Sequence, residues 1–376
     1  TINKNYGELN IEYIDTSSVD KGHLGATQKL KLEEAPSRAK RILKDNDILI
    51  STVRPNLKHF FFVEKSKTTL IGSTGFAVIS SKKINPRFLY YYLTTDKYTD
   101  FLSSIADAHT STYPSFNPNV IENSFCPYPK EDEQKFIAKI LSDLDSKIEL
   151  NQQMNKSLEV IGQILFKKWF VDEKKEDWKG GKLGDYVESI SGCSYTSEGL
   201  ESSENALVTL KSIGINGFKQ EGFKEYTGDY NNKHLVQDGD IVVAHTDLTQ
   251  NRIILGKPVI VRDFGKYKKM IASMDLSIVR PTKLINKSYL FYLLNTDVFH
   301  GYAQGCANGT TVIHLSRKAI PEFSFLIPDE KLLEKFKILS DNLFNQIRIN
   351  DLQNQTLSKI RDALLPKLMS GEIRVR

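Results

Sequence analysis

The sequence predicts an α+β protein in which two pseudo-symmetric mixed α/β modules alternate with two long helices that form an antiparallel coiled coil. Two observations predict this architecture. A segment near the middle of the chain has the apolar spacing of a long coiled-coil helix, and this segment recurs, with the module before it, in the second half. The parts are a first module at 1–129, a central helix at 130–172, a second module at 178–328 and a C-terminal helix at 329–371.

The central helix is indicated by residues 132–170, which contain no proline. Steps of alternately four and three residues from Ile137 to Trp169 meet mainly apolar side chains for more than four heptads, which is typical of a coiled-coil seam. At about 1.5 Å per residue this helix reaches about 58 Å, so we expect it to have a partner. The intervening seam positions are Leu141, Leu144, Ile148, Asn151, Asn155, Leu158, Gly162 and Leu165.

The partner is predicted at the C-terminus, where the pattern recurs 199 residues later. Asparagine at a seam position costs stability and sets register or partner choice, so we expect Asn151 and Asn155 to face Asn354 and Asn350. Pseudo-symmetry favours antiparallel pairing, although the heptads leave the orientation open. The alternative is two unrelated amphipathic helices in separate cores. The second seam consists of Phe336, Ser340, Leu343, Ile347, Asn350, Asn354, Leu357, Arg361, Leu364 and Leu368.

The first module is predicted to contain several strands and one helix. LNIEYIDTSSVDKG predicts a strand that runs into a turn, and ILISTVR, HFFFVEK and TTLIGSTGFAVIS predict further strands. NPRFLYYYLTTDKYTDFL predicts one helix with Pro86 near its start. The polar loop AHTSTYPSFNPN leads to the strand-like SFCPYP, and an acidic first turn then begins the central helix.

The second module repeats this order. ALVTLKSIGINGF, GDIVVAHTD, KKMIASMDLSIVRP and SYLFYLLNTDVF match the strands and the helix of the first module, and CANGTTVIHLS matches its polar loop. The second module also begins with WKGGKLGDYVESISGCSYTSEGLESSEN, which has no counterpart before the first, and the chain starts at Thr1. We therefore expect that about 25 residues are missing at the N-terminus, which mass spectrometry of the native protein would test.

Composition indicates a reduced, globular protein. The chain has 376 residues, 40% hydrophobic and 26% charged, with a net charge of +5, which is compatible with a polyanionic partner but too small to demonstrate one. Cys126, Cys193 and Cys306 are isolated and odd in number, so we expect reduced cytoplasmic thiols without metal. No apolar run approaches the roughly 20 residues that span a membrane, and no signal peptide is visible.

The sequence contains no recognisable catalytic motif. It has no G-x-x-x-x-G-K-[ST] phosphate loop, no G-x-G-x-x-G after a strand, no G-x-S-x-G elbow and no histidine pair at metal-ligand spacing. Asn117-Pro118-Asn119 superficially resembles an adenine-methyltransferase motif but lacks its second proline and its aromatic residue, so we interpret it as a turn. We predict no catalytic residue, metal or cofactor. A nuclease site built from dispersed carboxylates and a lysine is the enzymatic alternative.

Taken together and in order, these pieces strongly resemble the specificity (S) subunit of Type I restriction–modification enzymes. The resemblance is carried by DILISTVR and GDIVVAHTD, PRFLYYYL and SYLFYLL, NGTTVIHLS, the helix starts PKEDEQKFI and PDEKLLEKF, and the C-terminal LSKIRDALLPKLMSGEI. It covers essentially the whole chain. The central helix departs from it where FKKWFVD replaces LPKLMSG, which suits a helix that leads into a second module.

The resemblance implies that each module is a target-recognition domain for one half of a split site in double-stranded DNA. The helices would form a spacer between half-sites and dock two methyltransferase (M) subunits and, through them, restriction (R) subunits. Adenine methylation would belong to the M subunits. Four residues inserted near Asn151 should move one module by roughly 6 Å and alter the preferred spacer. The alternatives are a specificity subunit of a related non-Type I system, and a coiled-coil adaptor whose two modules bind proteins.

Candidate DNA contacts are basic, amide and hydroxyl side chains near the matched strand ends and loops, because phosphates and base edges are recognised by such groups. In the first module they are Lys29, Lys31, Arg38, Lys40, Arg41, Arg54, Lys58, His59, Thr110, Ser111, Thr112 and Tyr113. In the second module they are Lys211, His245, Thr246, Asn251, Arg252, Lys268, Lys269, Asn308, Thr310 and Thr311. The aromatic side chains of Phe88, Tyr90, Tyr91 and Tyr92 are expected in the core rather than on bases.

Overall fold

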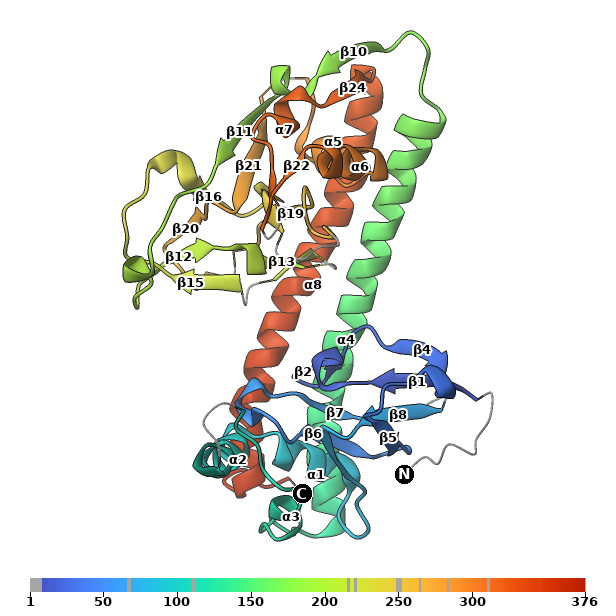
Figure 1. Ribbon diagram of the computed structural model, residues 1–376, viewed down its shortest axis with the longest axis vertical. Helices are drawn as coiled ribbons and strands as arrows, with labels where there is room; N and C mark the ends of the chain where they lie inside the picture. Colours follow the sequence, from blue (N-terminus) through green and yellow to red (C-terminus); the bar gives the residue numbers. More distant parts are fainter. Residues whose placement is uncertain are drawn as a thin grey trace. The chain divides into compact units, whose positions relative to one another are not determined.

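The computed structural model describes residues 9–65, 69–109, 113–214, 217–219, 222–247, 252–263, 265–282, 284–309 and 312–375. The chain forms two compact units. The first comprises Thr1–Ile148 and Thr356–Arg376, and the second comprises Glu149–Gln355. Each unit therefore holds one mixed module together with part of both long helices, α4 (Glu131–Lys167) and α8 (Glu330–Ser370) (Figure 1).

The first unit contains two small sheets and a hairpin. One sheet has the order β4-β1-β8-β5, with β1 and β8 parallel, and the other is antiparallel with the order β7-β6-β9. Strand β6 is buried along its whole length, as its apolar sequence predicted. The strands are β1 (Asn10–Ile14), β2 (Val19–Asp20), β3 (His23–Leu24), β4 (Gln28–Lys31), β5 (Ala39–Ile42), β6 (Ile48–Ser51), β7 (Phe60–Phe62), β8 (Leu70–Ser73) and β9 (Phe76–Ile79).

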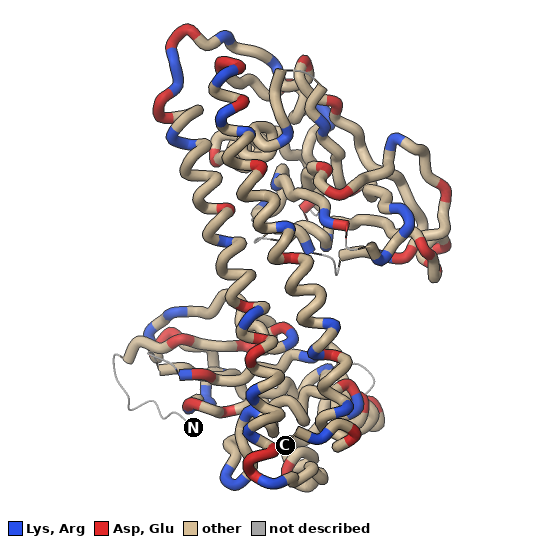
Figure 2. Tube along the Cα trace, turned by 180° about the vertical axis from the view of Figure 1, so that it is seen from behind, with Lys and Arg blue, Asp and Glu red and all other residues tan. Residues whose placement is uncertain are grey.

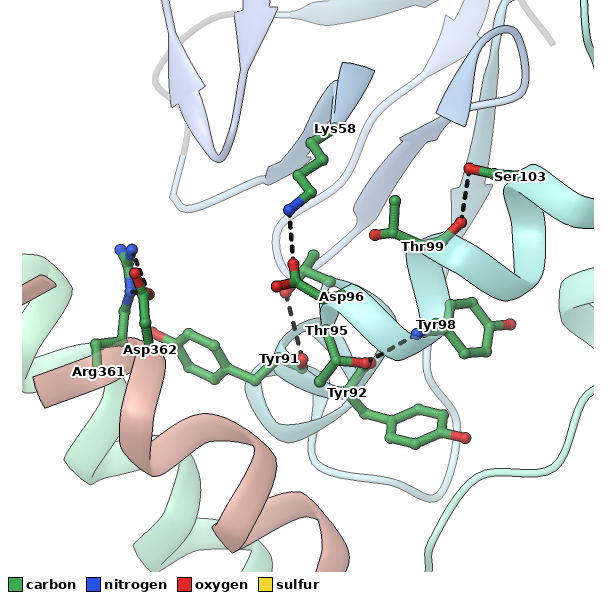
Figure 3. Close-up of polar contacts among 11 residues, drawn as sticks. Lys58, Tyr91, Tyr92, Thr95, Asp96, Tyr98, Thr99, Ser103, Arg361 and Asp362 are labelled. Atoms are coloured by element: carbon green, nitrogen blue, oxygen red, sulfur yellow. Dashed lines mark hydrogen bonds and ion pairs between the residues drawn. The ribbon is translucent and has the colours of Figure 1, made fainter. Parts of the chain in front are cut away.

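The segment predicted as one helix forms two, α1 (Pro86–Leu93) and α2 (Asp96–His109), which are followed by α3 (Asn119–Glu122). The Thr95 hydroxyl accepts a hydrogen bond from the backbone N–H of Tyr98 at 3.3 Å and so caps a new helix (Figure 3). The prediction of a single helix was wrong because the apolar spacing continues through a threonine that starts the second helix.

The aromatic residues of α1 lie in the core of the first unit, as predicted. Phe88, Tyr90 and Tyr91 are buried, and the Tyr91 hydroxyl donates to Asp145 of α4 at 2.7 Å. The backbone N–H of Asn85 donates to the Gln134 side chain of α4 at 2.7 Å. These contacts attach the first module to the beginning of the long helix.

The second unit repeats this plan with more strands. Its sheets have the orders β11-β21-β17-β19, β15-β12-β20-β16 and β18-β23-β22, with two-stranded pairs β10-β24 and β13-β14. The strands are β10 (Lys179–Lys182), β11 (Val187–Ser191), β12 (Asn205–Val208), β13 (Ile213–Gly214), β14 (Gly217–Phe218), β15 (Phe223–Glu225), β16 (Leu235–Val236), β17 (Ile241–Ala244), β18 (Thr246–Asp247), β19 (Pro258–Ile260), β20 (Lys269–Ala272), β21 (Leu276–Pro281), β22 (Ala307–Asn308), β23 (Ile313–Leu315) and β24 (Ser324–Ile327). The helices are α5 (Lys287–Leu294), α6 (Asp297–Gly305) and α7 (Ala319–Glu322).

The same backbone hydrogen bonds recur in the two units. The N–H of Thr52 donates to Gly75 O at 2.9 Å, and the N–H of His245, at the matched strand end, donates to Asp275 O at 2.7 Å. The residue that follows the polar loop then returns to this strand end, through Phe116 N–H to Thr52 O at 3.0 Å and through Leu315 N–H to His245 O at 2.8 Å. The internal repeat is therefore a repeat of backbone structure.

The two long helices run antiparallel where they meet in the second unit. Asn151 Nδ2 donates to Asn354 Oδ1 at 2.9 Å, and Asn350 Nδ2 donates to Asn155 Oδ1 at 2.7 Å. These hydrogen bonds join the asparagines that we expected to face one another, and their reversed order defines the orientation. Asn151 and Asn350 are 0% and 2% exposed, so the amides meet inside the seam.

The helices also pack together in the first unit. Ile137 and Leu141 of α4 share one apolar core with Leu364 and Leu368 of α8. Arg361 of α8 pairs with Asp145 of α4 at 2.8 Å. All the predicted seam residues of both helices are buried or half-buried.

Strands β10 and β11 of the second unit have no counterpart among the described residues of the first. β10 pairs with β24, and β11 pairs with β21. β10 and β11 come from the stretch that has no match in the sequence of the first module. Residues 124–129 match β24 but form no strand, and Phe125 there is 95% exposed. The prediction of a strand at SFCPYP was wrong because a strand needs a hydrogen-bonded neighbour.

Within the described ranges, no helix is long and apolar enough to cross a membrane. The same residues contain no group of three or more His, Cys, Asp or Glu side chains that could hold a metal ion. Cys126, Cys193 and Cys306 are free thiols.

Candidate nucleic-acid interface

In the first unit, the end of β6 and the segment after the polar loop meet at one place. Val53 forms a β-bridge with Ser115, and the N–H of Arg54 donates to Pro114 O at 2.8 Å. The fold thus brings together two regions, far apart in the sequence, in which DNA contacts were predicted.

Arg54 and Lys58 lie on either side of a short turn, Pro55–Leu57, and both have left-handed backbones with φ of 49° and 58°. Such conformations cost energy in residues other than glycine and are concentrated at functional loops. The Arg54 guanidinium carbon lies 5.0 Å from the ring centroid of Tyr113, which is 64% exposed. Arg54 of this turn and Tyr113 of the returning segment therefore place a cation and an aromatic ring side by side at the surface.

Lys58 has a partner within its own unit. Its Nζ lies 2.6 Å from Oδ1 of Asp96, and the side chain of Asp96 is largely exposed (Figure 3). An exposed pair of this kind is weak, so a phosphate could compete with Asp96 for the lysine. His59, the next residue, is half-buried.

The other candidates of the first unit lie on its larger sheet. The two edge strands of this sheet carry Lys29 and Lys31 on β4, and Lys40 and Arg41 on β5. All four are exposed, but β1 and β8 separate the two pairs. The backbone of Arg38 lies closer to the Arg54 turn. The carbonyl of Arg38 accepts a hydrogen bond from Thr74 N–H, and the carbonyl of Gly75, which follows Thr74, accepts one from Thr52 N–H. The sheet therefore does not gather these residues into one patch.

In the second unit, the matched segments meet in the sheet β18-β23-β22. Thr246 and Asn308, both predicted from the sequence, lie opposite His314 on its two sides. Our sequence reasoning missed His314. The signal was present, because His314 is the one polar residue between Ile313 and Leu315, as expected for an outward position in a half-buried strand.

His245 immediately precedes β18 and is half-buried. Its Nδ1 is 3.0 Å from the Ser277 hydroxyl. Burial lowers the pKa of His245, and the positive charge of Arg317 and the proximity of His314 lower it further. A neutral imidazole bound to Ser277 is suited to holding the strand end rather than to neutralising a phosphate.

The remaining candidates of the second unit are dispersed. Arg252 has a left-handed backbone, with φ of 52°, and donates to Gln304 O at 3.2 Å. Lys211 is exposed and follows β12. Lys268 and Lys269 lie at the opposite end of that sheet, the start of β20, where they bond to Glu204 at 2.6 Å and to the Tyr230 hydroxyl at 3.0 Å.

Six predicted contacts lie outside the described residues: Thr110, Ser111, Thr112, Asn251, Thr310 and Thr311. They remain predictions. Basic and acidic residues are interspersed over each unit (Figure 2), so charge alone does not define a binding surface. The features shared by the two units are a strand end, a returning segment and the exposed side chains that this junction carries.

Comparison with known proteins gives a consistent result. Residues 2–160 match the family model of the Type I restriction modification DNA specificity domain. The chain is 24% identical to the specificity subunit of the Type I restriction enzyme HindI of Haemophilus influenzae, over 97% of this chain and 94% of that subunit. It is 27% identical to the MjaIX specificity subunit of Methanocaldococcus jannaschii, over 97% of this chain and 85% of that subunit.

Among solved structures, the crystal structure of a Type I restriction–modification S subunit from M. genitalium has the same fold. It matches with a TM-score of 0.54 at 15% identity, over 98% of this chain and 91% of that one. The sequence motifs, the repeated frame and these matches agree: residues 2–160 match the DNA specificity domain, and nearly the whole chain is similar to specificity subunits of Type I restriction enzymes.

Proposed function

We propose that this chain recognises a bipartite site in double-stranded DNA, with one module for each half-site, and that it has no catalytic role of its own. The observation that carries the proposal is the repeated junction. The same backbone hydrogen bonds hold Thr52 to Phe116 and His245 to Leu315, whereas the surface residues beside them differ. A shared frame with different exposed side chains suits two modules that recognise different sequences.

We further propose that α4 and α8 set the spacer between the half-sites. A helix of 37 residues extends about 55 Å, which exceeds the roughly 34 Å of one turn of B-DNA. One heptad inserted in each helix, after Ile148 and after Gln355, would add about 10 Å while keeping the seam. The preferred spacer should then change while both half-site sequences remain the same. An unchanged spacer would exclude this role.

The helices also carry a candidate docking surface for methyltransferase subunits, through which restriction subunits would join. Leu150, Met154, Ile161 and Ile164 are exposed on α4 within the second unit, and their spacing places them on one face. Exposed apolar side chains gathered on one helix face are typical of an interaction surface. Ile161→Asp with Ile164→Asp should abolish co-purification with methyltransferase subunits, whereas Gln152→Asp with Gln163→Asp, on the same helix, should not.

The proposal as a whole is tested by mapping DNA methylation in cells with and without this chain, co-expressed with its methyltransferase subunit. We expect a split, asymmetric motif that depends on the chain. If no motif depends on it while complexes with proteins alone persist, the coiled-coil adaptor is the better explanation.

A variant pair tests the first module directly. Arg54→Ala with Lys58→Ala should weaken DNA binding by the assembled complex. It should also reduce the salt dependence of the affinity, because binding without a given phosphate contact releases about one counterion fewer from the DNA. Lys82→Ala with Lys83→Ala is the matched control. It removes the same charge from exposed positions just beyond β9, at the opposite end of the same sheet. Equal affinities for the two double variants would exclude the Arg54 turn as a contact.

A further inference from the structure

We propose that Thr246, His314 and Asn308 form a base-binding site for a purine in the second half-site, and that His314 is its specificity-determining residue. The inference rests on the proposed function and identifies the group recognised at one position. It is drawn from the junction of β18 with β22 and β23, which come much later in the sequence, so no local motif indicates it.

The register of the sheet places the three residues in one row. Thr246 of β18 and Asn308 of β22 lie opposite the same residue of β23, His314. Directly opposed residues of antiparallel strands project to the same face of a sheet. On β23, Ile313 and Leu315 are 2% exposed, whereas His314 is exposed. His314 and Asn308 are therefore exposed at the surface, over a core that fixes the strand, whereas Thr246 in the same row is buried.

The imidazole of His314 is oriented by the hydroxyl of Thr246 on the neighbouring strand. Thr246 is 3% exposed, and its hydroxyl lies 3.4 Å from Nδ1 of His314. With the hydroxyl as donor to Nδ1, Nε2 carries a proton and faces away from Thr246 as a hydrogen-bond donor. A donor held in this way loses little freedom on binding, which favours recognition of one defined acceptor.

The acceptor that fits is N7 of a purine. Both adenine and guanine present N7 in the major groove, and the next position along the edge is a donor in adenine and an acceptor in guanine. Asn308, beside His314 in the row and also exposed, carries an amide that pairs with either group. His314 thus selects purine over pyrimidine, and Asn308 supplies the second hydrogen bond.

The matched junction of the first unit supports the assignment. There Val53 lies opposite Ser115 in place of Thr246 opposite His314, although the backbone bonds around them are the same. The frame is thus kept while the outward side chain changes from a short hydroxyl to an imidazole. This is the pattern expected of a position that determines which base is bound, and not of a position that holds the fold.

Nearby basic residues have a different role. Arg317 and Lys318 follow β23 and are exposed. Their charges suit phosphates, which position a protein on DNA without reporting sequence. Their loss should weaken binding at all sites alike, so they provide a control for the loss of base recognition.

The experiment measures the motif methylated by the complete complex with the methyltransferase subunits. His314→Ala should relax one position of the second half-site from purine to any base, with a loss of discrimination of roughly 5- to 150-fold, and leave the first half-site unchanged. Lys318→Ala should lower the affinity for all sites with the motif intact. Retention of full discrimination by a folded His314→Ala complex would overturn the assignment.

A second measurement does not depend on the folding of a variant. The wild-type complex is tested on DNA in which each purine of the second half-site is replaced in turn by its 7-deaza analogue, which lacks N7. One position should lose affinity, and that loss should disappear in His314→Ala. Uniform tolerance of all 7-deaza substitutions would also overturn the assignment. Failure of the proposed function would look different, because the wild-type complex would then show no motif at all.

Discussion

Gly162 is expected to allow the second module to pack closely against α4. It is a buried seam residue, and a Cβ added there would lie 2.8 Å from Cε1 of Tyr292 and still closer to its hydroxyl oxygen. Tyr292 is 2% exposed and cannot turn aside easily, because its ring stacks on Phe344 at 5.5 Å and meets Phe336 edge-on at 5.6 Å.

The expected effect of Gly162→Ala is the difference between two opposing contributions. Alanine favours a helix interior over glycine by about 1 kcal/mol. Overpacking of a well-filled core costs about 1–3 kcal/mol. We therefore expect a net loss in the free energy of unfolding of up to about 2 kcal/mol. Gly301→Ala in α6 is the matched control, because among the described residues an added Cβ there would meet no atom within 4 Å outside its own helix, and it should stabilise the protein instead.

Tyr292→Phe completes the test as a double-mutant cycle. Among the described residues the buried hydroxyl of Tyr292 has no hydrogen-bond partner, so its removal should not destabilise the protein. It also removes the atom nearest to the added methyl group. The double variant should therefore be more stable than the sum of the single effects by about 1 kcal/mol.

Denaturant unfolding followed by tryptophan fluorescence is the appropriate assay, because the only two tryptophans, Trp169 and Trp178, both belong to the second unit. Two results would refute this reasoning. One is stabilisation by Gly162→Ala equal to that by Gly301→Ala, and the other is simple additivity in the cycle. Either result would mean that the ring of Tyr292 has space to move away from the added methyl group.

Two further predictions concern the helix pair. Asn151→Leu should cost about 1–3 kcal/mol in unfolding experiments because it leaves the amide of Asn354 without this partner inside the seam, and Asn151→Leu with Asn354→Leu should recover most of that loss. Glu159 of α4 has its pKa raised from 4.5 to about 7, first by burial and then by Asp351. Because the folded state holds this proton more tightly, the second unit should lose stability as the pH rises from about 4.5 to about 7. Glu159→Gln should flatten the dependence of the free energy of unfolding on pH in this range. An unchanged dependence would contradict the assignment.

Much of the candidate site could be approached from the sequence, but not completed. The matched strand ends and loops identified Arg54, Tyr113, Thr246 and Asn308, because duplication preserves position along the chain. His314 was missed because only the strand order places it between Thr246 and Asn308. A one-dimensional pattern indicates that a residue faces outward, but it does not indicate which distant strand lies beside it.

The sequence by itself determined the long helices, their contact faces and the asparagines that meet across the seam. These depend on a period of 3.5 residues and on an internal repeat, both of which are local or periodic properties. Tertiary structure decided where α1 ends and α2 begins, which lysines bond within their own unit, and which side chains form a row on the sheet β18-β23-β22. These features depend on strand pairing, on helix capping and on which ion-pair partners are available. The interactions that decide them form only when distant segments of the chain come together.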